Sequence, residues 1–300
     1  MVAEVLTALQ PRPGGRYVDG TIGGAGHAEV ILRASAPNGW LFGCDRDGAA
    51  VEAASRRLAE YADRCEIRRG NFAELAAWIS PLSCDGVLLD LGVSSAQLDQ
   101  AERGFSFQQD GPLDMRMDGR QTCRAADLAN SMDEQELARI FRELGDEREG
   151  RRIARAIVRE RDRAPITTTG QLARLIERWV PRRGRKLHPA TRVFQALRMA
   201  VNDEVGSLHR GLPAVWGLVK PGGRLAIITF HSTEARIVKQ FGHKLSRGYR
   251  VTGDRDLPEF REACGPELRL VNRRPLQPGA TEVVANPRAR SAQLRVFERL

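Results

Sequence analysis

The chain has 300 residues, of which 42% are hydrophobic and 28% are charged, and its net charge is +9. These proportions are typical of a globular protein and exclude a disordered chain, and no apolar run approaches the roughly 18 residues of a membrane span. The five cysteines are scattered and form no C-x-x-C pair, which argues against a disulfide framework or a cysteine zinc site.

The start of the chain and its charge predict where the protein works and what it binds. No basic segment precedes the first apolar residues, so we expect no signal peptide and a cytoplasmic location. The excess of positive charge suits a polyanion such as RNA, although the preference for arginine over lysine can also reflect genome composition.

The first 92 residues alternate apolar stretches with amphipathic ones. Strands are predicted at 16–20, 40–45, 65–70 and 86–92, with helices near 27–35, 47–60 and 72–79. Strands separated by helical patterns of this length indicate right-handed βαβ units. The expected fold class is therefore α/β, with a doubly wound, mostly parallel sheet.

This alternation breaks after residue 103. Helical patterns follow at 133–144, 148–162, 168–180 and 188–208, and no strong strand candidate lies between 104 and 187. A strand at 222–232, a helix at 233–245 and a strand at 291–299 return the chain to the sheet. We expect a sheet domain built from 1–103 and 196–300, interrupted by a helical insertion over 104–195.

The stretch RYVDGTIGGAGHAEVIL, residues 16–32, predicts a strand, a glycine-rich turn and the start of a helix. Ligands of open parallel sheets bind beyond the carboxyl ends of the strands, and three predicted strands end at or near an acid: Asp19, Asp45 and Asp90. The dinucleotide pattern G-x-G-x-x-G is absent, because Glu29 stands at its third glycine. A pyrophosphate would also be repelled by Asp19.

A cationic nucleoside cofactor fits this pattern better. S-adenosylmethionine carries a sulfonium and an ammonium, which acids at the strand ends attract, and Asp45 is placed to accept both ribose hydroxyls. The glycine turn lets the backbone approach the methionine part. The alternative is that Asp19 and Asp45 are only turn or N-cap residues.

The predicted insertion carries the densest basic run in the chain. Its members are Arg148, Arg151, Arg152, Arg155, Arg159, Arg161 and Arg163, followed later by Arg182, Arg183, Arg185 and Lys186. Nearby acids are too few to neutralise the run by i,i+4 pairing. We therefore expect the insertion to recognise RNA, with the footprint on Arg151, Arg152, Arg155 and Arg159. A solvated helix face is the alternative.

Seven stretches, in order along nearly the whole chain, resemble the ribosomal RNA small subunit methyltransferase H family. They are YVDGTIGGAGH, GCDRD, LLDLGVSSAQLDQAERGFSFQQDGPLDMRMD, RRIARAIV, HPATRVFQALRMAVNDE, GGRLAIITFHS and NPRARSAQLRVFER. The long third stretch, residues 88–118, is highly specific. The resemblance implies a Rossmann-like bacterial enzyme that uses S-adenosyl-L-methionine to methylate the amino nitrogen N4 of one cytidine in the decoding region of 16S ribosomal RNA.

The resemblance also implies a set of cofactor contacts. They are Ala25, Gly26, His27, Asp45, Phe72, Asp90 and Gln97, and the pattern of strand-end acids adds Asp19. Taken alone, Phe72 would more readily be a core residue.

The end of the fourth predicted strand is where we expect the chemistry. Cytosine's amino lone pair is delocalised into the ring, so methyl transfer needs positioning and an acceptor for the amino hydrogens. We expect Asp90 and His231 to act in catalysis. The alternative role of Asp90 is contact to the cofactor, and the alternative role of His231 is a strand-end hydrogen bond. The DLGVSS stretch lacks the prolines and aromatic usual in amino-methyltransferases, so the base must stack elsewhere. Candidates are Phe105, Phe107, Phe230 and His231.

Two departures from the family pattern matter. Members usually begin with a His-x-Pro-Val stretch, whereas this chain starts at Met1 inside the equivalent region, so we expect any wall that the stretch builds to be missing. Members also usually have glycine where Ala25 stands. If that backbone needs a positive φ, alanine costs roughly 1 kcal/mol.

Two other functions stay open on the sequence alone. One is a DNA amino-methyltransferase, against which the missing proline-aromatic signature counts. The other is a non-enzymatic RNA-binding assembly factor that retains the cofactor. No His/Cys/Asp cluster has metal-ligand spacing, so we expect no metal. The sequence predicts no membrane partner and leaves the oligomeric state open, a homodimer included.

Overall fold

The computed structural model describes residues 1–181 and 187–300, which form two compact units. The sheet unit comprises Met1–Gly92 and Gly206–Leu300, and the helical unit comprises Val93–Val205. No helix in the described ranges is both long and apolar enough to cross a membrane.

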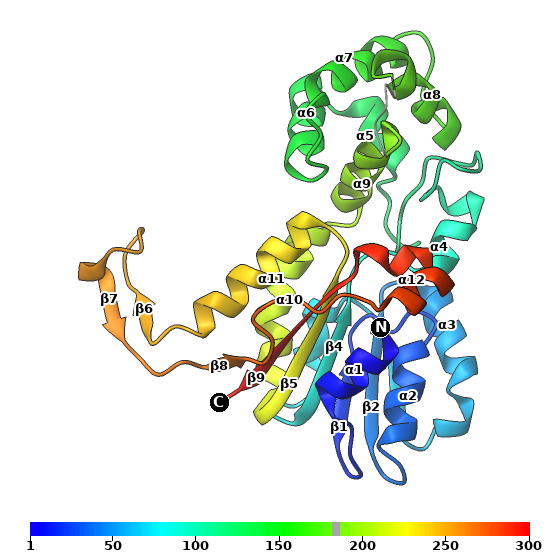
Figure 1. Ribbon diagram of the computed structural model, residues 1–300. Coiled ribbons are helices and arrows are strands. Elements are labelled where there is room, and N and C mark those ends of the chain that lie inside the picture. Colours follow the sequence, from blue (N-terminus) through cyan, green and yellow to red (C-terminus); the bar gives the residue numbers. More distant parts are fainter. Residues whose placement is uncertain (182–186) are drawn as a thin grey trace. The chain divides into compact units, whose positions relative to one another are not determined.

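The sheet unit is built on seven strands in the order β3-β2-β1-β4-β5-β9-β8 (Figure 1). Their bounds are β1 Arg16–Asp19, β2 Trp40–Asp45, β3 Cys65–Arg69, β4 Cys84–Asp90, β5 Val219–Thr229, β8 Leu268–Leu270 and β9 Gln293–Arg299. Strands β1 to β5 pair in parallel, while β9 runs antiparallel to both β5 and β8. The predicted doubly wound, mostly parallel α/β sheet is confirmed.

Helices cover both faces of this sheet (Figure 1). One face packs apolar side chains such as Leu9 and Ile31 of α1 (Val2–Leu9) and α2 (Gly26–Ala34), together with those of α3 (Gly48–Arg57), against Tyr17 and Leu88. The other face carries the 3-10 helix η2 (Phe72–Ala77), α10 (Glu204–Leu218) and α11 (Ser232–Leu245). There Phe241 of α11 packs edge-on against aromatic rings of α10 and β9.

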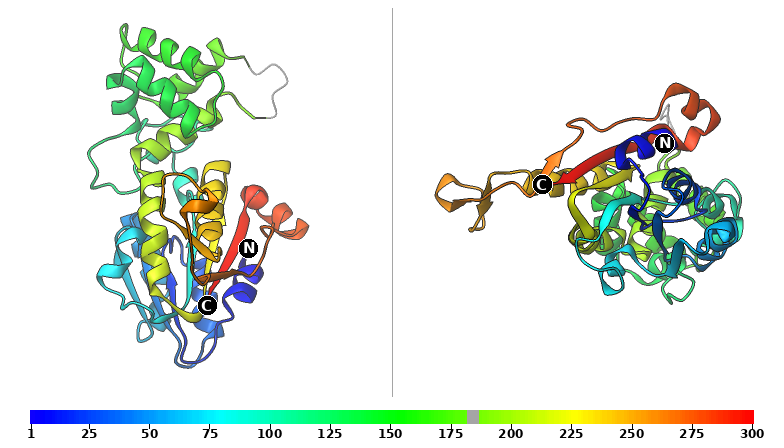
Figure 2. Two further views of the ribbon diagram at one scale, coloured as in Figure 1. Left: turned by 90° about the vertical axis from the view of Figure 1, so that its left-hand side faces the viewer. Right: turned by 90° about the horizontal axis from the view of Figure 1, so that it is seen from below.

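Shorter elements complete the sheet unit. They are η1 Ala59–Tyr61, β6 Tyr249–Val251, η4 Pro258–Phe260, β7 Arg261–Ala263, α12 Ala280–Ala285 and η5 Pro287–Ser291. Strands β6 and β7 pair only with each other, as a ribbon that projects from the rest of the sheet unit (Figure 2).

The helical unit has its own apolar core, to which every long helix of the unit contributes. Its elements are α4 Ser95–Asp99, η3 Ala101–Arg103, α5 Ala125–Ser131, α6 Glu134–Glu143, α7 Gly150–Arg161, α8 Thr169–Trp179 and α9 Ala190–Val201. Local sequence starts the helices: Asp133 caps α6, and Thr168 caps α8 in a capping box with Gln171. The patterns at 133–144, 148–162 and 168–180 are thus confirmed as helices.

One element of the predicted layout was wrong. The helix expected near 72–79 is present as the 3-10 helix η2, and the two compact units divide after residues 92 and 205, where the sequence placed the boundaries after 103 and 195. The single helix expected at 188–208 is broken at Asn202 and Asp203. Asn202 is buried, accepts the Met117 N–H at 2.8 Å and donates to the Met115 carbonyl at 2.8 Å. Asp203 then adopts a left-handed φ of 44° and α10 begins.

Candidate active site

Three acids lie at the carboxyl edge of the parallel strands, two of them beside the point where the strand order reverses. Asp19 ends β1 and Asp90 ends β4, and these strands are neighbours on either side of the reversal, while Asp45 ends β2 next to β1. Such a reversal is where open α/β sheets bind their ligands. The topology therefore brings together the strand-end acids singled out in the sequence.

The glycine turn between β1 and α2 has the conformation of a ligand cradle. Gly23 has a φ of 48° and donates its N–H to Asp45 Oδ2 at 2.9 Å, so β2 holds the turn in place. A Cβ on Gly24 would meet no atom within 4 Å, which leaves room for a ligand against its backbone. Ala25 is the N-cap of α2 in the left-handed region, at φ 59° and ψ 24°, and Gly26 is the first helical residue.

We expect Ala25→Gly to raise the free energy of unfolding by about 0.2–1.2 kcal/mol. Glycine relieves roughly 1–2 kcal/mol of left-handed strain, and removing the buried methyl group costs about 0.8 kcal/mol. Thermal unfolding followed by circular dichroism measures the difference. Ala28→Gly is the matched control, since Ala28 is equally buried but sits inside α2, where glycine and the lost methyl group together should destabilise by about 1.3–1.8 kcal/mol. A fall in stability for Ala25→Gly would show that the turn is not strained.

Asp19 is the most deeply placed acid of the site, with 2% of its surface exposed. Burial raises its pKa to about 7, against the opposing effects of His27 and of the Thr21 N–H at 3.2 Å. The nearby charges of Asp90 and Asp45 raise it further. Near neutral pH Asp19 is therefore only partly ionised, and a cation bound beside it would favour the ionised form.

His27 and Asp90 form a loose pair, with His27 Nε2 3.5 Å from Asp90 Oδ2. Burial lowers the pKa of His27, but Asp90 and Asp19 raise it by more, so the net shift is upward. His27 Nδ1 and Asp90 Oδ1 are both buried and have no hydrogen-bond partner among the described residues. Two unpaired polar atoms at one strand edge are the mark of a site that a polar ligand completes.

Thr21 holds the backbone of Asp90 in place, and the sequence did not predict it as a site residue. Its hydroxyl oxygen accepts the backbone N–H of Asp90 at 2.6 Å, which ties the glycine turn to the end of β4. Its place directly after the DG of the first strand was the only signal that could have indicated it.

Asp45 has a structural role in the glycine turn. Its Oδ2 accepts from Gly23 and its Oδ1 accepts from the Asp47 N–H at 2.9 Å, and burial raises its pKa. It is thus a turn residue, as the alternative interpretation held. Each oxygen keeps a second lone pair, however, so the carboxylate can also accept from a ligand.

His231 lies at the start of α11, where its ring contacts Glu234. It is the N-cap residue, and its Nδ1 accepts the Glu234 N–H at 3.4 Å. Its Nε2 lies 3.0 Å from Glu234 Oε1, a distance suited to an ion pair, although not at a hydrogen-bonding angle. Glu234 in turn accepts the Phe230 N–H at 2.9 Å. The strand-end hydrogen bond that we weighed against catalysis is therefore present.

Two further residues expected at the cofactor have structural partners. The ring of Phe72 is 8% exposed and lies where a Cβ on Gly211 of α10 would come within 2.1 Å of it, so it fills the core between η2 and α10. Gln97 belongs to the helical unit, where its side chain accepts the Ser94 N–H at 3.0 Å in a capping box.

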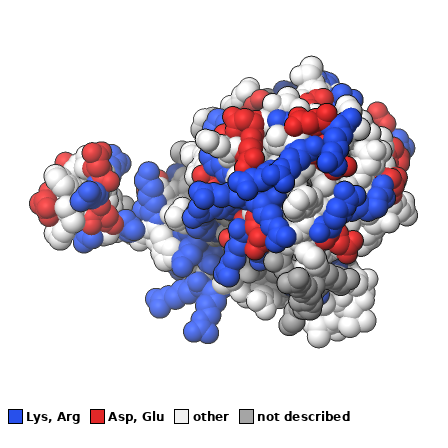
Figure 3. All heavy atoms as spheres, turned by 90° about the horizontal axis from the view of Figure 1, so that it is seen from above, with Lys and Arg blue, Asp and Glu red and all other residues white. Residues whose placement is uncertain are grey.

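The arginines assigned to RNA lie on α7. Arg151, Arg152, Arg155 and Arg159 are all exposed, and basic side chains form a band across the face of the helical unit in Figure 3. No ion pair between described residues includes Arg151, Arg152 or Arg159, and Arg155 pairs only with Glu134 at 3.3 Å.

The acids close to this run in sequence do not neutralise it. Glu147 is buried and accepts the backbone N–H of Glu149, while Glu160 pairs with Arg178 of α8 at 3.9 Å. The later basic residues at 182–186 lie outside the described ranges.

Known proteins of one family are similar to this chain over its full length. The model of the MraW methylase family matches residues 1–300. Proteins named ribosomal RNA small subunit methyltransferase H are similar over the full chain: 53% identical in Geobacter sulfurreducens, covering 100% of this chain and 97% of the relative, and 52% in Syntrophotalea carbinolica, covering 100% and 96%. A relative of the same name in Symbiobacterium thermophilum is 48% identical, covering 100% and 95%.

Proposed function

This chain belongs to the MraW methylase family, and on that premise we propose that it methylates the amino nitrogen N4 of a cytidine in the decoding region of bacterial 16S ribosomal RNA. S-adenosyl-L-methionine is the methyl donor. The full-length relatives support small-subunit ribosomal RNA as the substrate. The methylated nitrogen, N4, and the position of the cytidine go beyond what the names of these relatives state.

The observation that carries the proposal is the acid cluster with unpaired atoms at the strand-order reversal. Bound there, S-adenosylmethionine supplies a methyl group activated by a sulfonium cation. Asp19 and Asp90 attract its positive charges, Asp45 accepts from the ribose, and the backbone of Gly24, Ala25 and Gly26 approaches the methionine part. The free space beside Gly24 and the unpaired Asp90 Oδ1 are where this chain fits such a ligand.

We assign to Asp90 the role of accepting the proton that the cytosine amino group loses on methylation. His27 occupies the Oδ2 side, so Oδ1 is the oxygen left to accept an amino hydrogen of the cytosine. Holding that hydrogen turns the nitrogen lone pair toward the methyl group and prepares the proton for removal. His231 stays a proposed participant, but its two ring nitrogens already face Glu234, which favours Asp90 as the base.

The test uses labelled S-adenosylmethionine and three substrates: bare small ribosomal subunits, free RNA and DNA. We expect label in the small subunits, at a single cytidine when the modified nucleotide is mapped. Label in DNA alone would favour the DNA amino-methyltransferase, and cofactor binding without any transfer would favour a non-enzymatic assembly factor.

Replacing Arg151, Arg152, Arg155 and Arg159 together by glutamine should weaken RNA binding and reduce its salt dependence. Four lost phosphate contacts correspond to a decrease of about 3 in the slope of log K against log salt for single-stranded RNA. Fluorescence anisotropy at several salt concentrations measures the slope, and cofactor affinity should stay unchanged.

The matched control removes the same charge elsewhere. Arg33, Arg56, Arg68 and Arg269 are exposed arginines of the sheet unit, each already paired with an acid. Their replacement should change the slope much less. Equal slopes for the two quadruple variants would mean that α7 presents only a solvated face.

A further inference from the structure

A hollow of about 390 Å³ lies on the helical unit between α7 and the end of α8. It is lined by Arg151, Arg152, Arg155, Ala156, Arg159 and Trp179. We infer that this hollow binds one unpaired RNA nucleotide, whose base stacks on Trp179 while the arginines hold its phosphates. The inference rests on the proposed function and adds to it the form of RNA that the helical unit reads.

The floor of the hollow is apolar and firmly supported. Trp179 is the last residue of α8 and is half-buried, with part of its ring packed against the core of the helical unit. Ala156 of α7 is 3% exposed and too small to fill the space above it. A ring fixed by packing offers a stacking surface without further loss of side-chain entropy on binding.

The side of the hollow that α7 forms is basic. Arg151, Arg155 and Arg159 recur at four-residue spacing on α7, which places them on one face of the helix, and Arg152 lies beside them. The pair between Arg155 and Glu134 is exposed on both sides, and such a pair is weak enough for a phosphate to displace. None of the described residues that line this hollow is an acid.

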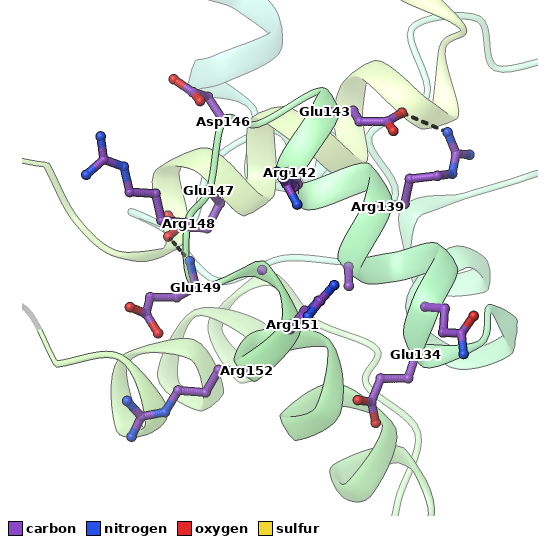
Figure 4. Close-up of a pocket in the computed structure, with 13 residues that line it drawn as sticks. Glu134, Arg139, Arg142, Glu143, Asp146, Glu147, Arg148, Glu149, Arg151 and Arg152 are labelled. Atoms are coloured by element: carbon purple, nitrogen blue, oxygen red, sulfur yellow. Dashed lines mark hydrogen bonds and ion pairs between the residues drawn. The ribbon is translucent and has the colours of Figure 1, made fainter.

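A neighbouring hollow shows the contrast. It measures about 1280 Å³ and lies between α6 and α7, with Arg142 and Arg151 set among acidic side chains (Figure 4). Five of its lining residues are arginines and five are Asp or Glu, including the Arg139–Glu143 pair at 2.9 Å. Its charges are balanced, so a phosphate gains less there than in the smaller hollow.

Size and chemistry together favour an unpaired nucleotide over a duplex. A volume near 400 Å³ is in the range of pockets for a single small ligand. In a duplex both faces of each base are covered by its neighbours, so only an unstacked base can lie on an aromatic ring. Arginines alone would bind the backbone of either form, and Trp179 is what distinguishes the two.

The experiment compares Trp179→Leu and Trp179→Phe in the full chain. Leucine keeps the apolar packing of Trp179 but removes the aromatic face, whereas phenylalanine keeps a smaller one. With a short single-stranded RNA as the probe, we expect Trp179→Leu to bind about tenfold more weakly and Trp179→Phe to stay within about threefold of wild type. Binding of the same sequence as a duplex should change by less than about twofold.

Wild-type methylation of small subunits is measured on the same preparations, so that the two proposals can fail separately. An inactive wild-type protein would count against the proposed function. An active wild type, with Trp179→Leu binding single-stranded RNA as tightly, would overturn the nucleotide site alone. Equal losses for single-stranded and duplex RNA would also overturn it. If Trp179→Leu weakened only the binding of an acidic peptide such as polyglutamate, the nucleotide site would likewise be overturned, because the hollow would then bind a protein partner.

Discussion

Asp90→Asn should slow single-turnover methyl transfer about 100-fold or more, while cofactor affinity changes by less than about tenfold. Asparagine keeps the shape and one acceptor oxygen but loses the charge and the ability to take a proton. The loss should be large because Asp90 Oδ1 is buried and has no hydrogen-bond partner among the residues that the structure describes, so none of these bonded groups stands ready to replace it. Rapid-quench measurement at saturating cofactor and RNA gives the rate.

Asp85→Asn is the matched control for this variant. Asp85 is the second residue of the same strand, near its opposite end, where it pairs with Lys220 at 2.7 Å, so its replacement should lower stability and leave the rate unchanged. If Asp90→Asn instead weakens the cofactor and keeps the rate at saturation, Asp90 holds the cofactor and another group receives the proton. Values near wild type for both would remove Asp90 from the active site.

Asp45→Ala should weaken S-adenosylmethionine binding by about 1–3 kcal/mol, or roughly 5- to 150-fold in Kd. The ribose hydroxyls lose a charged acceptor, and the N–H groups of Gly23 and Asp47 lose their partner as well. Isothermal titration calorimetry measures the affinity.

Because the N–H groups of Gly23 and Asp47 lose their partner in Asp45→Ala, this variant needs a control for reduced stability. Asp133→Ala removes an N-cap of the helical unit, which should cost about 1 kcal/mol of stability without affecting the cofactor. Asp45→Asn, which keeps one acceptor oxygen for the turn, should recover more stability than affinity. Unchanged affinity in Asp45→Ala, with the fold intact, would rule out Asp45 as a ribose contact.

The placement of the acids could be predicted from sequence because it depends on topology alone. Once βαβ units were established, the ends of β1, β2 and β4 had to meet at one edge, and Asp19, Asp45 and Asp90 with them. The left-handed backbone at Ala25 was likewise foreseeable, since a glycine-rich turn into a helix commonly needs a positive φ.

Features that depend on distant partners could not be predicted. The break between α9 and α10 is fixed by hydrogen bonds from Asn202 to backbone at 115 and 117, more than eighty residues earlier in the chain. Helical periodicity continues through that position, so the local pattern favoured one long helix. His231 posed a related problem: its place after a strand suits catalysis and helix capping equally well, and only the position of Glu234 shows the cap.

The discontinuity of the sheet unit has a consequence for how the chain folds during synthesis. The helical unit is one continuous segment, complete at Val205, whereas β4 must wait for β5, whose Ala226 pairs with Leu88. Until then β4, which is mostly buried in the finished sheet, has an open edge, a form prone to wrong pairing. The helical unit can therefore fold on the ribosome first, and the last third of the chain, through long-range contacts that form slowly, closes the sheet and with it the edge that carries Asp90.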